Sequence, residues 1–176
     1  MGTVARIRGG ATNPPVITLA MLAHDAKKED LRSFTHAHRE IMGSFRILAP
    51  EDTARVIADQ SLDVDALAPD MLGGDMQIGA AVVEGRVDAV IFLHDPLAAL
   101  PAEPDVKMFL KVCDLERVPI ATNLATAEIL IRHLGRISRS GARADRHPSG
   151  RAQGLERVLW LAAAQPQPTP EGESHG

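Results

Sequence analysis

Three carboxylates in this chain stand where a predicted strand or helix begins or ends. Asp75 follows the pair Gly73-Gly74, Asp95 closes an apolar run, and Asp105 opens a predicted helix. Carboxylates that crowd together raise one another's pKa, and an ionised member of such a group can remove a proton as a general base. Their placement therefore favours proton-transfer chemistry on a small molecule.

The elements that would position these carboxylates alternate between strands and helices. Apolar runs predict strands at 16–23, 45–48, 63–70, 87–93 and 118–122. Helical spacing of apolar residues follows each run, at 24–43, 50–60, 75–85, 105–118 and 123–135. Gly135 is expected to end the last helix. The order predicts an α/β class protein: a three-layer, Rossmann-like single domain with a five-stranded, mostly parallel sheet and helices on both faces.

Ligands of an open parallel sheet bind beyond the carboxyl ends of its strands. We call the residues that directly follow the strands at this edge the carboxyl lip. In the predicted fold the lip holds His24 and Asp25, residues 49–52, Asp70 with the turn before Asp75, His94 and Asp95, and Thr122 and Asn123. The five acids expected to share this rim are Asp25, Asp70, Asp75, Asp95 and Asp105.

Each of these polar residues also has a purely structural explanation. Asp75 and Asp105 can cap a helix N-terminus, and Asp95 can initiate a turn with the proline after it. His24 can bond the neighbouring backbone, and Lys28 can be a solvated charge on a helix. The two glycines before Asp75 favour a functional role there, because glycine lets the backbone approach a ligand closely. For the others both explanations stay open.

Composition and charge narrow the class of protein. A chain of 176 residues can bury one sizeable core, and its formal net charge of −4 argues against a nucleic-acid partner. Cys113 is the only cysteine, so an intrachain disulfide is excluded, and its apolar helical setting predicts a small buried residue. The N-terminus has no long apolar run, so we expect no signal peptide, no membrane anchor and a cytoplasmic location. The histidines show no spacing typical of a metal site.

The two ends of the chain differ in composition from the middle. Residues 1–14 predict a flexible N-terminal arm, 15–135 the α/β domain, 136–164 an Arg-rich linker with a possible helix, and 165–176 a disordered tail. The Arg-rich stretch is either a solvated linker or a cover that folds over a site of this chain or of a neighbouring subunit.

Four segments taken together resemble methylglyoxal synthases. They read AHDAKK, GGDMQIGA, EGRVDAVIFLHDPLAALPAEPDVK and CDLERVPIATNLATAEILI, and they cover about residues 15–132 in the right order. The same fold is found, with weaker motif agreement, in the allosteric domain of carbamoyl phosphate synthetase and in a purine-synthesis cyclohydrolase. The resemblance implies the α/β fold predicted above.

The resemblance also implies a reaction. A methylglyoxal synthase takes dihydroxyacetone phosphate, removes a carbon-bound proton to give an enediolate, and expels phosphate to leave methylglyoxal, without a metal or an organic cofactor. It implies a homo-oligomer, a hexamer in the family. Carried over by motif, the catalytic base would be Asp75, the supporting carboxylates Asp95 and Asp105, and the substrate-binding residues His24, Asp25, Lys28, Gly73 and Gly74.

The phosphate-binding turn departs from the family's pattern. That turn reads Thr-Gly-Thr-Thr-Gly at the start of the helix after the second strand, where hydroxyls and free N–H groups receive an anion. In this sequence Ala49, Pro50, Glu51 and Asp52 stand in place of the first four residues, and Thr53 follows. Pro50 lacks an N–H donor, and the two acids put negative charge where a dianion would lie.

Two further departures affect the same site. The family's Ser-Gly before the glycine pair is Pro69-Asp70, and its catalytic His is Ala102. Like charges a few Å apart cost on the order of a few kcal/mol near a surface, and a lost oxyanion donor costs about 3 kcal/mol. Two functions therefore stay open. One is a methylglyoxal synthase-type lyase, and the other is a diverged member that binds or acts on a different small polar ligand.

Overall fold

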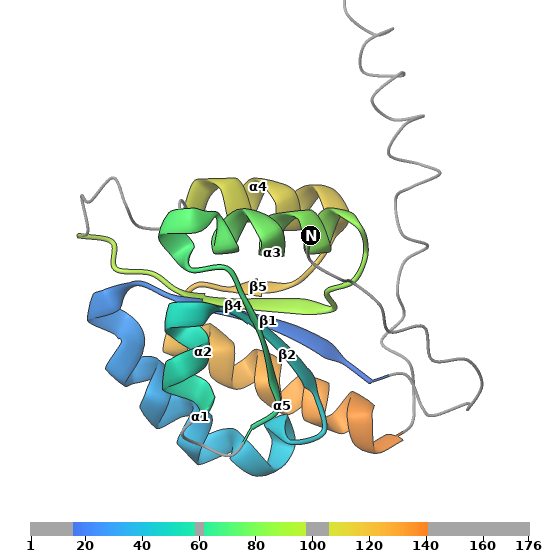
Figure 1. Cartoon of the computed structure of the whole chain (residues 1–176). Coiled ribbons are helices and arrows are strands. Elements are labelled where there is room, and N and C mark those ends of the chain that lie inside the picture. Colours follow the sequence, from blue (N-terminus) through green and yellow to red (C-terminus); the bar gives the residue numbers. More distant parts are fainter. Residues whose placement is uncertain (1–15, 59–61, 98–105, 141–176) are drawn as a thin grey trace, which may run out of the picture.

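A five-stranded parallel sheet forms the centre of the fold (Figure 1). The computed structural model describes residues 16–58, 62–97 and 106–140. Its strands are β1 (Thr18–Ala23), β2 (Arg46–Pro50), β3 (Val64–Leu67), β4 (Ala89–Leu93) and β5 (Ile120–Ala121). They lie in the order β3-β2-β1-β4-β5, and every neighbouring pair is parallel. The predicted α/β class and five-stranded sheet are confirmed, and the described sheet is wholly parallel.

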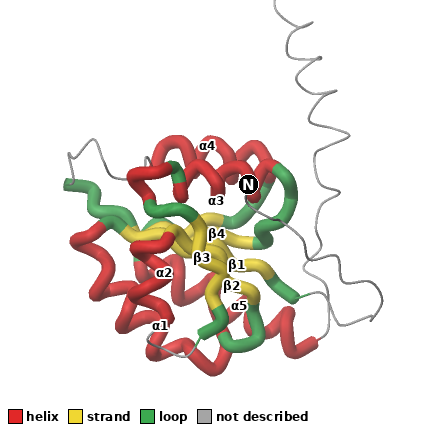
Figure 2. Tube along the Cα trace, viewed as in Figure 1, coloured by secondary structure: helices red, strands yellow, loops and turns green. Residues whose placement is uncertain are grey.

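Helices cover both faces of the sheet, as predicted (Figure 2). On one face lie α1 (Lys28–Met42), α2 (Glu51–Ala58) and α5 (Leu124–Ser140), which share a core with Leu19, Met21 and Leu93 of the sheet. On the other lie α3 (Gly74–Val83) and α4 (Val106–Glu116), which pack against Leu22 and Phe92. Two short 3₁₀ turns, Asp25–Lys27 and Asp70–Leu72, precede α1 and α3.

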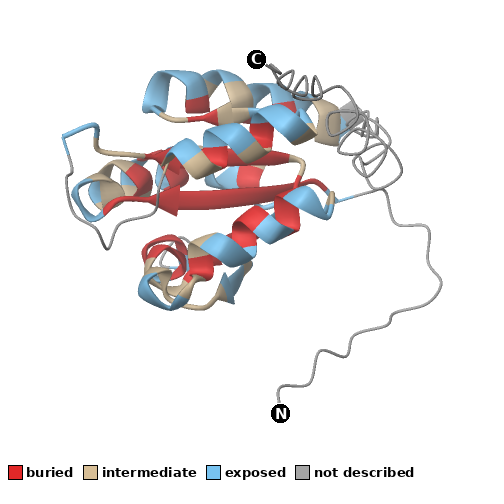
Figure 3. Ribbon diagram, turned by 90° about the horizontal axis from the view of Figure 1, so that it is seen from above, coloured by how far each residue is buried: buried red, intermediate tan, exposed pale blue. Residues whose placement is uncertain are grey.

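The central strands are uniformly apolar because both of their faces are covered. All described residues of β1 and β4 are buried (Figure 3). Their successive side chains alternate between the two cores. The chain runs outward from β1 through β2 to β3 and then returns to the opposite side of β1 as β4. This reversal places a topological switch point between β1 and β4, which is where such sheets bind ligands.

The last helix does not end at Gly135, and this prediction was wrong. Helix α5 continues to Ser140, so Arg136 and Arg139 are helical rather than part of a linker. A Cβ at Gly135 would lie 2.7 Å from Cγ2 of Ile41 on α1. This glycine is therefore present because two helices approach closely, not because a helix ends there. The other predicted boundaries differ from the structure by a few residues at most.

The predicted N-terminal arm, the rest of the Arg-rich stretch and the predicted tail lie outside the described residues. Cys113 is buried on α4 as predicted, and burial raises the pKa of its thiol to about 12. None of the helices in the described ranges has the length and apolar character needed to cross a membrane.

Candidate active site

His24 and Asp95 meet at the switch point between β1 and β4. His24 is buried, with 6% of its surface exposed, and its backbone N–H donates to the carbonyl of Leu93 at 3.1 Å. Its Nδ1 accepts the backbone N–H of Asp95 at 3.0 Å. A ring nitrogen that accepts a hydrogen bond carries no proton, so this bond assigns the hydrogen to Nε2. The fold therefore orients His24 and fixes its tautomer, with Nε2–H as a donor.

Lys28 and Asp25 form an ion pair beside His24. The Lys28 Nζ lies 2.5 Å from Oδ1 of Asp25, three residues earlier in the chain. The lysine side chain is 25% exposed, whereas that of the aspartate is 83% exposed. Lys28 is thus partly buried at the lip, and the cation that the resemblance assigns to substrate contact already has a carboxylate partner.

Gly73 and Gly74 position Asp75 through backbone geometry. Gly73 has φ +86°, in the left-handed region that favours glycine, and it is the N-cap residue of α3. A Cβ at Gly74 would lie 1.9 Å from the carbonyl oxygen of Ala68. Asp75 stands in the first turn of α3, where its Oδ1 accepts the backbone N–H of Met76 at 2.7 Å. Gly73 and not Asp75 is therefore the N-cap residue, while the Asp75 carboxylate still binds a backbone N–H of the first turn, and its catalytic part stays a prediction.

Asp70 lies among several charged groups. Burial, followed by the charges of Asp75, Asp52 and Asp25, raises its pKa to about 6, while Lys28 acts in the opposite direction. Its Oδ1 is buried and has no hydrogen-bond partner within the described part of the chain. We call the four carboxylates Asp25, Asp52, Asp70 and Asp75 the acidic cluster. The structure thus brings together three of the predicted rim acids, Asp25, Asp70 and Asp75, and adds Asp52. Within residues 16–58, 62–97 and 106–140, no group of three or more His, Cys, Asp or Glu side chains is arranged to hold a metal ion.

The position of the family's phosphate turn presents acids instead of hydroxyls. β2 ends at the buried Pro50, and α2 starts directly with Glu51 and Asp52. Arg55, one turn later, bonds the Glu51 carboxylate and lies 4.0 Å from that of Asp52. The charge of the two acids is therefore partly balanced from within the helix.

Two other residues of this turn face the protein interior. Ala49 is fully buried in the core shared with α1, α2 and α5. Thr53 is also fully buried, and its hydroxyl has no hydrogen-bond partner among the described residues. Of the five residues that replace the family's turn, Thr53 alone has a hydroxyl.

Asp95 has a local role that the sequence allowed for. Its Oδ1 accepts the backbone N–H of Leu97 at 3.0 Å, which makes it the initiator of a turn. It is not among the charges that shift the pKa of Asp70. Asp105 and Ala102 lie outside the described residues, so a catalytic part for Asp105 stays a prediction.

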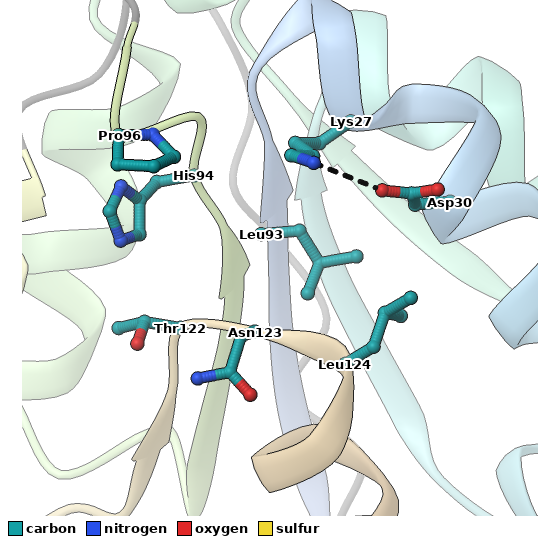
Figure 4. A pocket seen from close by; sticks show the side chains of 8 residues that line it. All are labelled: Lys27, Asp30, Leu93, His94, Pro96, Thr122, Asn123 and Leu124. Carbon is teal, nitrogen blue, oxygen red and sulfur yellow. Dashed lines mark hydrogen bonds and ion pairs between the residues drawn. The ribbon is translucent and has the colours of Figure 1, made fainter.

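A cavity of about 270 Å³ opens at the other half of the lip, beyond β4 and β5 (Figure 4). Neither Asp75 nor Asp95 is among its described lining residues, Asp105 lies outside the described part of the chain, and a pocket beside Asp75 stays a prediction. The strand order placed His94, Thr122 and Asn123 at this edge but could not show that they enclose a space. The lining residues are Lys27, Asp30, Leu93, His94, Pro96, Thr122, Asn123 and Leu124.

Comparison with known proteins gives one consistent family. Residues 30–122 match the family model of the MGS-like domain. The methylglyoxal synthase of Cupriavidus pinatubonensis is 46% identical over 120 residues, which are 68% of this chain and 92% of that protein. That of Moorella thermoacetica is 45% identical over 117 residues, or 66% of this chain and 91% of the relative.

A solved structure agrees with the sequence relatives. The crystal structure of methylglyoxal synthase from Elizabethkingia anophelis NUHP1 superposes with a TM-score of 0.63 at 33% identity, covering 66% of this chain and 77% of the other. Sequence motifs, fold and coverage agree, and the chain belongs to the methylglyoxal synthase family.

Proposed function

We propose that this protein is a methylglyoxal synthase-type lyase in which Asp75 is the base. The Asp75 carboxylate takes a carbon-bound proton from dihydroxyacetone phosphate, and the C–H electron pair forms the enediolate. The enediolate then breaks the C–O bond to phosphate, and phosphate leaves with the electron pair of that bond. The enol that remains rearranges to methylglyoxal. The observation that supports this most strongly is the placement of Asp75, which the two glycines hold in the first turn of α3 within the acidic cluster.

The neighbouring groups suit proton transfer. Because the pKa of Asp70 is raised to about 6, this carboxyl takes up a proton more readily than an ordinary aspartate does. A proton on Asp70 removes one like charge beside Asp75 and so helps Asp75 to stay ionised. His24 lies at the same lip, where its Nδ1 accepts the backbone N–H of Asp95 and the ring is held in a fixed orientation. We propose that His24 contacts the substrate, as the family resemblance implies, while Ala102 stands at the position of the family's catalytic histidine.

A second candidate function is favoured by the acids at the phosphate turn. Glu51, Asp52 and Asp70 stand where a phosphate dianion would lie, and Arg55 balances only part of their charge. Like charges a few Å apart cost on the order of a few kcal/mol near a protein surface. Under this proposal the protein enolises, or only binds, a small polar ligand that has no phosphate group. If the protein enolises this ligand, Asp75 is again the base.

One experiment separates the two candidates. The purified protein is incubated with dihydroxyacetone phosphate, and release of phosphate and methylglyoxal is measured beside an Asp75→Asn control. In parallel, exchange of carbon-bound hydrogen for deuterium is followed by NMR in D₂O with dihydroxyacetone, which lacks the phosphate. Phosphate release that depends on Asp75 supports the lyase, whereas Asp75-dependent exchange of dihydroxyacetone without phosphate release supports the second candidate. Absence of both contradicts the role of Asp75.

Charge at the turn gives a further prediction. The double substitution Glu51→Gln and Asp52→Asn removes two negative charges from the start of α2. If the substrate is a phosphate ester, we expect kcat/KM for dihydroxyacetone phosphate to rise at least about tenfold, which corresponds to about 1.4 kcal/mol of relieved repulsion. The matched control is Glu84→Gln. Glu84 is exposed and pairs with Arg86 at the far end of α3. An unchanged double variant would show that these acids do not face the substrate.

The assembly and location are also proposals. We propose a homo-oligomer, a hexamer by the family resemblance, that works in the reducing cytoplasm on a small-molecule substrate. Light scattering coupled to size exclusion should then give a mass near six times the chain mass of 18.9 kDa. A mass of one chain would overturn the proposed assembly.

A further inference from the structure

The cavity beyond β4 and β5 is the described feature that the proposed chemistry does not use. We propose that it is a second binding site, for a small uncharged molecule that carries several hydroxyl groups, such as a polyol or a small sugar. Its walls come from three parts of the fold: the start of α1, the residues that follow β4, and the residues that join β5 to α5. Figure 4 shows these side chains arranged around the end of β4.

The size of the cavity indicates how much of an occupant it can cover. A volume of about 270 Å³ equals the share of roughly nine waters at about 30 Å³ each. It is slightly smaller than the pockets that hold drug-sized ligands, which begin near about 300 Å³. The cavity thus covers about a dozen non-hydrogen atoms or fewer, which suits a small molecule.

Among the described lining residues, the lysine and the aspartate balance each other's charge. Lys27 Nζ lies 3.3 Å from Oδ2 of Asp30, one turn further along the same segment, so the cation and anion of the lining pair with each other (Figure 4). An anionic ligand attracted by the lysine would be repelled by the carboxylate. A cationic ligand attracted by the carboxylate would be repelled by the lysine. A neutral ligand can bond to both without separating them.

The remaining polar groups offer both donors and acceptors. Asn123 Oδ1 accepts the backbone N–H of Thr126 at 3.0 Å, which orients the amide, while no described atom accepts from its Nδ2. The Thr122 hydroxyl likewise has no hydrogen-bond partner in the described part of the chain. A ligand hydroxyl donates and accepts, so it can satisfy an ammonium, a carboxylate, an amide and a hydroxyl alike. Leu93, Pro96 and Leu124 supply apolar surface for the C–H faces of such a ligand.

The cavity is distinct from the site of Asp75. Its described lining residues include none of the acidic cluster, although Lys27 of the cavity wall lies two residues from Asp25 of the cluster. Substitutions in the cavity wall and at Asp75 therefore change different residues, and the two sites can be tested separately.

Binding to the protein can be measured with glycerol and erythritol by saturation-transfer NMR. We expect transfer to both polyols, and a reduction of at least about fivefold in a Leu124→Trp variant, because the indole fills the cavity from a position that is already 39% exposed. Thr122→Val should weaken the signal, because it replaces the hydroxyl by a methyl group and leaves the shape of the side chain unchanged. Ser33→Ala, which removes an exposed hydroxyl from α1, is the matched control and should leave it unchanged.

The outcomes separate this proposal from the proposed lyase. Asp75→Asn should retain full polyol binding, whether or not it is inactive. Loss of binding in Asp75→Asn would place the polyol at the acidic cluster and overturn the proposal. Full binding in Leu124→Trp, or transfer to acetate in preference to glycerol, would overturn it as well.

Discussion

At the scale of single residues, Gly73 and Gly74 position the proposed base. Each position requires glycine for a different physical reason. Gly73 needs its left-handed φ of +86°, yet a Cβ at this position would have no atom within 4 Å, whereas a Cβ at Gly74 would meet the carbonyl of Ala68. We expect Gly73→Ala to lower the free energy of unfolding by about 1–2 kcal/mol, the cost of a left-handed alanine. Gly74→Ala should lower it by more than about 3 kcal/mol, because the backbone of the Asp75 turn must move.

Chemical denaturation of the two variants, with phosphate release or C–H exchange measured in parallel, checks this pair. The Gly73 variant should fold and keep Asp75 in place, so it serves as the control for the other. Equal stability losses in both variants would contradict the close approach between Gly74 and Ala68.

Asp70 gives a prediction for stability against pH. Its pKa rises from the ordinary 3.8 to about 6 in the folded chain, so the folded state disfavours the ionised carboxylate. This destabilisation is fully present above about pH 6 and disappears as the pH falls toward the ordinary value. Asp70→Asn should therefore raise the free energy of unfolding at pH 7.5 by on the order of 1 kcal/mol, a value discounted because half of the carboxyl remains near water.

Urea denaturation at pH 7.5 and about pH 4 measures that difference. The gain from Asp70→Asn should shrink at the lower pH, and Asp63→Asn, on an exposed carboxylate, should show no comparable pH-dependent gain. A gain of the same size at both pH values would mean that burial and the acidic neighbours do not raise the pKa of Asp70 in the folded chain.

At the scale of helices and strands, the contact between α1 and α5 depends on Gly135. A methyl group at Gly135 would lie 2.7 Å from Cγ2 of Ile41. Overpacking of the interface in Gly135→Ala should lower the free energy of unfolding by about 1–3 kcal/mol. The higher helix propensity of alanine offsets up to about 1 kcal/mol of this loss. Ile41→Leu removes the Cγ2 methyl that the new Cβ would contact. In that background, Gly135→Ala should lower the free energy of unfolding by less. Thermal or urea unfolding of the four chains of this cycle measures the coupling. Additive effects would contradict the contact.

The same elements show what the sequence could and could not predict. The apolar runs at 16–23 and 87–93 predicted β1 and β4, because strands covered on both faces contain few polar residues. Gly135 was misassigned because a glycine at the end of an apolar pattern usually ends a helix, and its contact with Ile41 on another helix is not visible locally. The strand ends correctly placed His24 and Asp95 at one edge, but not the bond between them.

At the scale of the whole molecule, the carboxyl lip has two halves on either side of His24. The acidic cluster lies where β1, β2 and β3 end, and the cavity lies where β4 and β5 end and is closed by Lys27 and Asp30 at the start of the segment after β1. The order of elements predicted that polar residues would gather at this edge. Their division could not be predicted, because the pKa of Asp70 and the cavity walls depend on side chains from separate loops. The acids at the phosphate turn were visible in the sequence, and the structure adds that Arg55 balances them in part.

The central claim is that Asp75 removes a carbon-bound proton, and deuterium exchange tests it most directly. Exchange into dihydroxyacetone phosphate and dihydroxyacetone is followed by NMR in D₂O for the unaltered chain and for Asp75→Asn, whose folding is verified by unfolding curves. Exchange in at least one substrate, reduced by about 10²–10⁴-fold in the variant, is the predicted result. Exchange that is undiminished in Asp75→Asn would contradict the account.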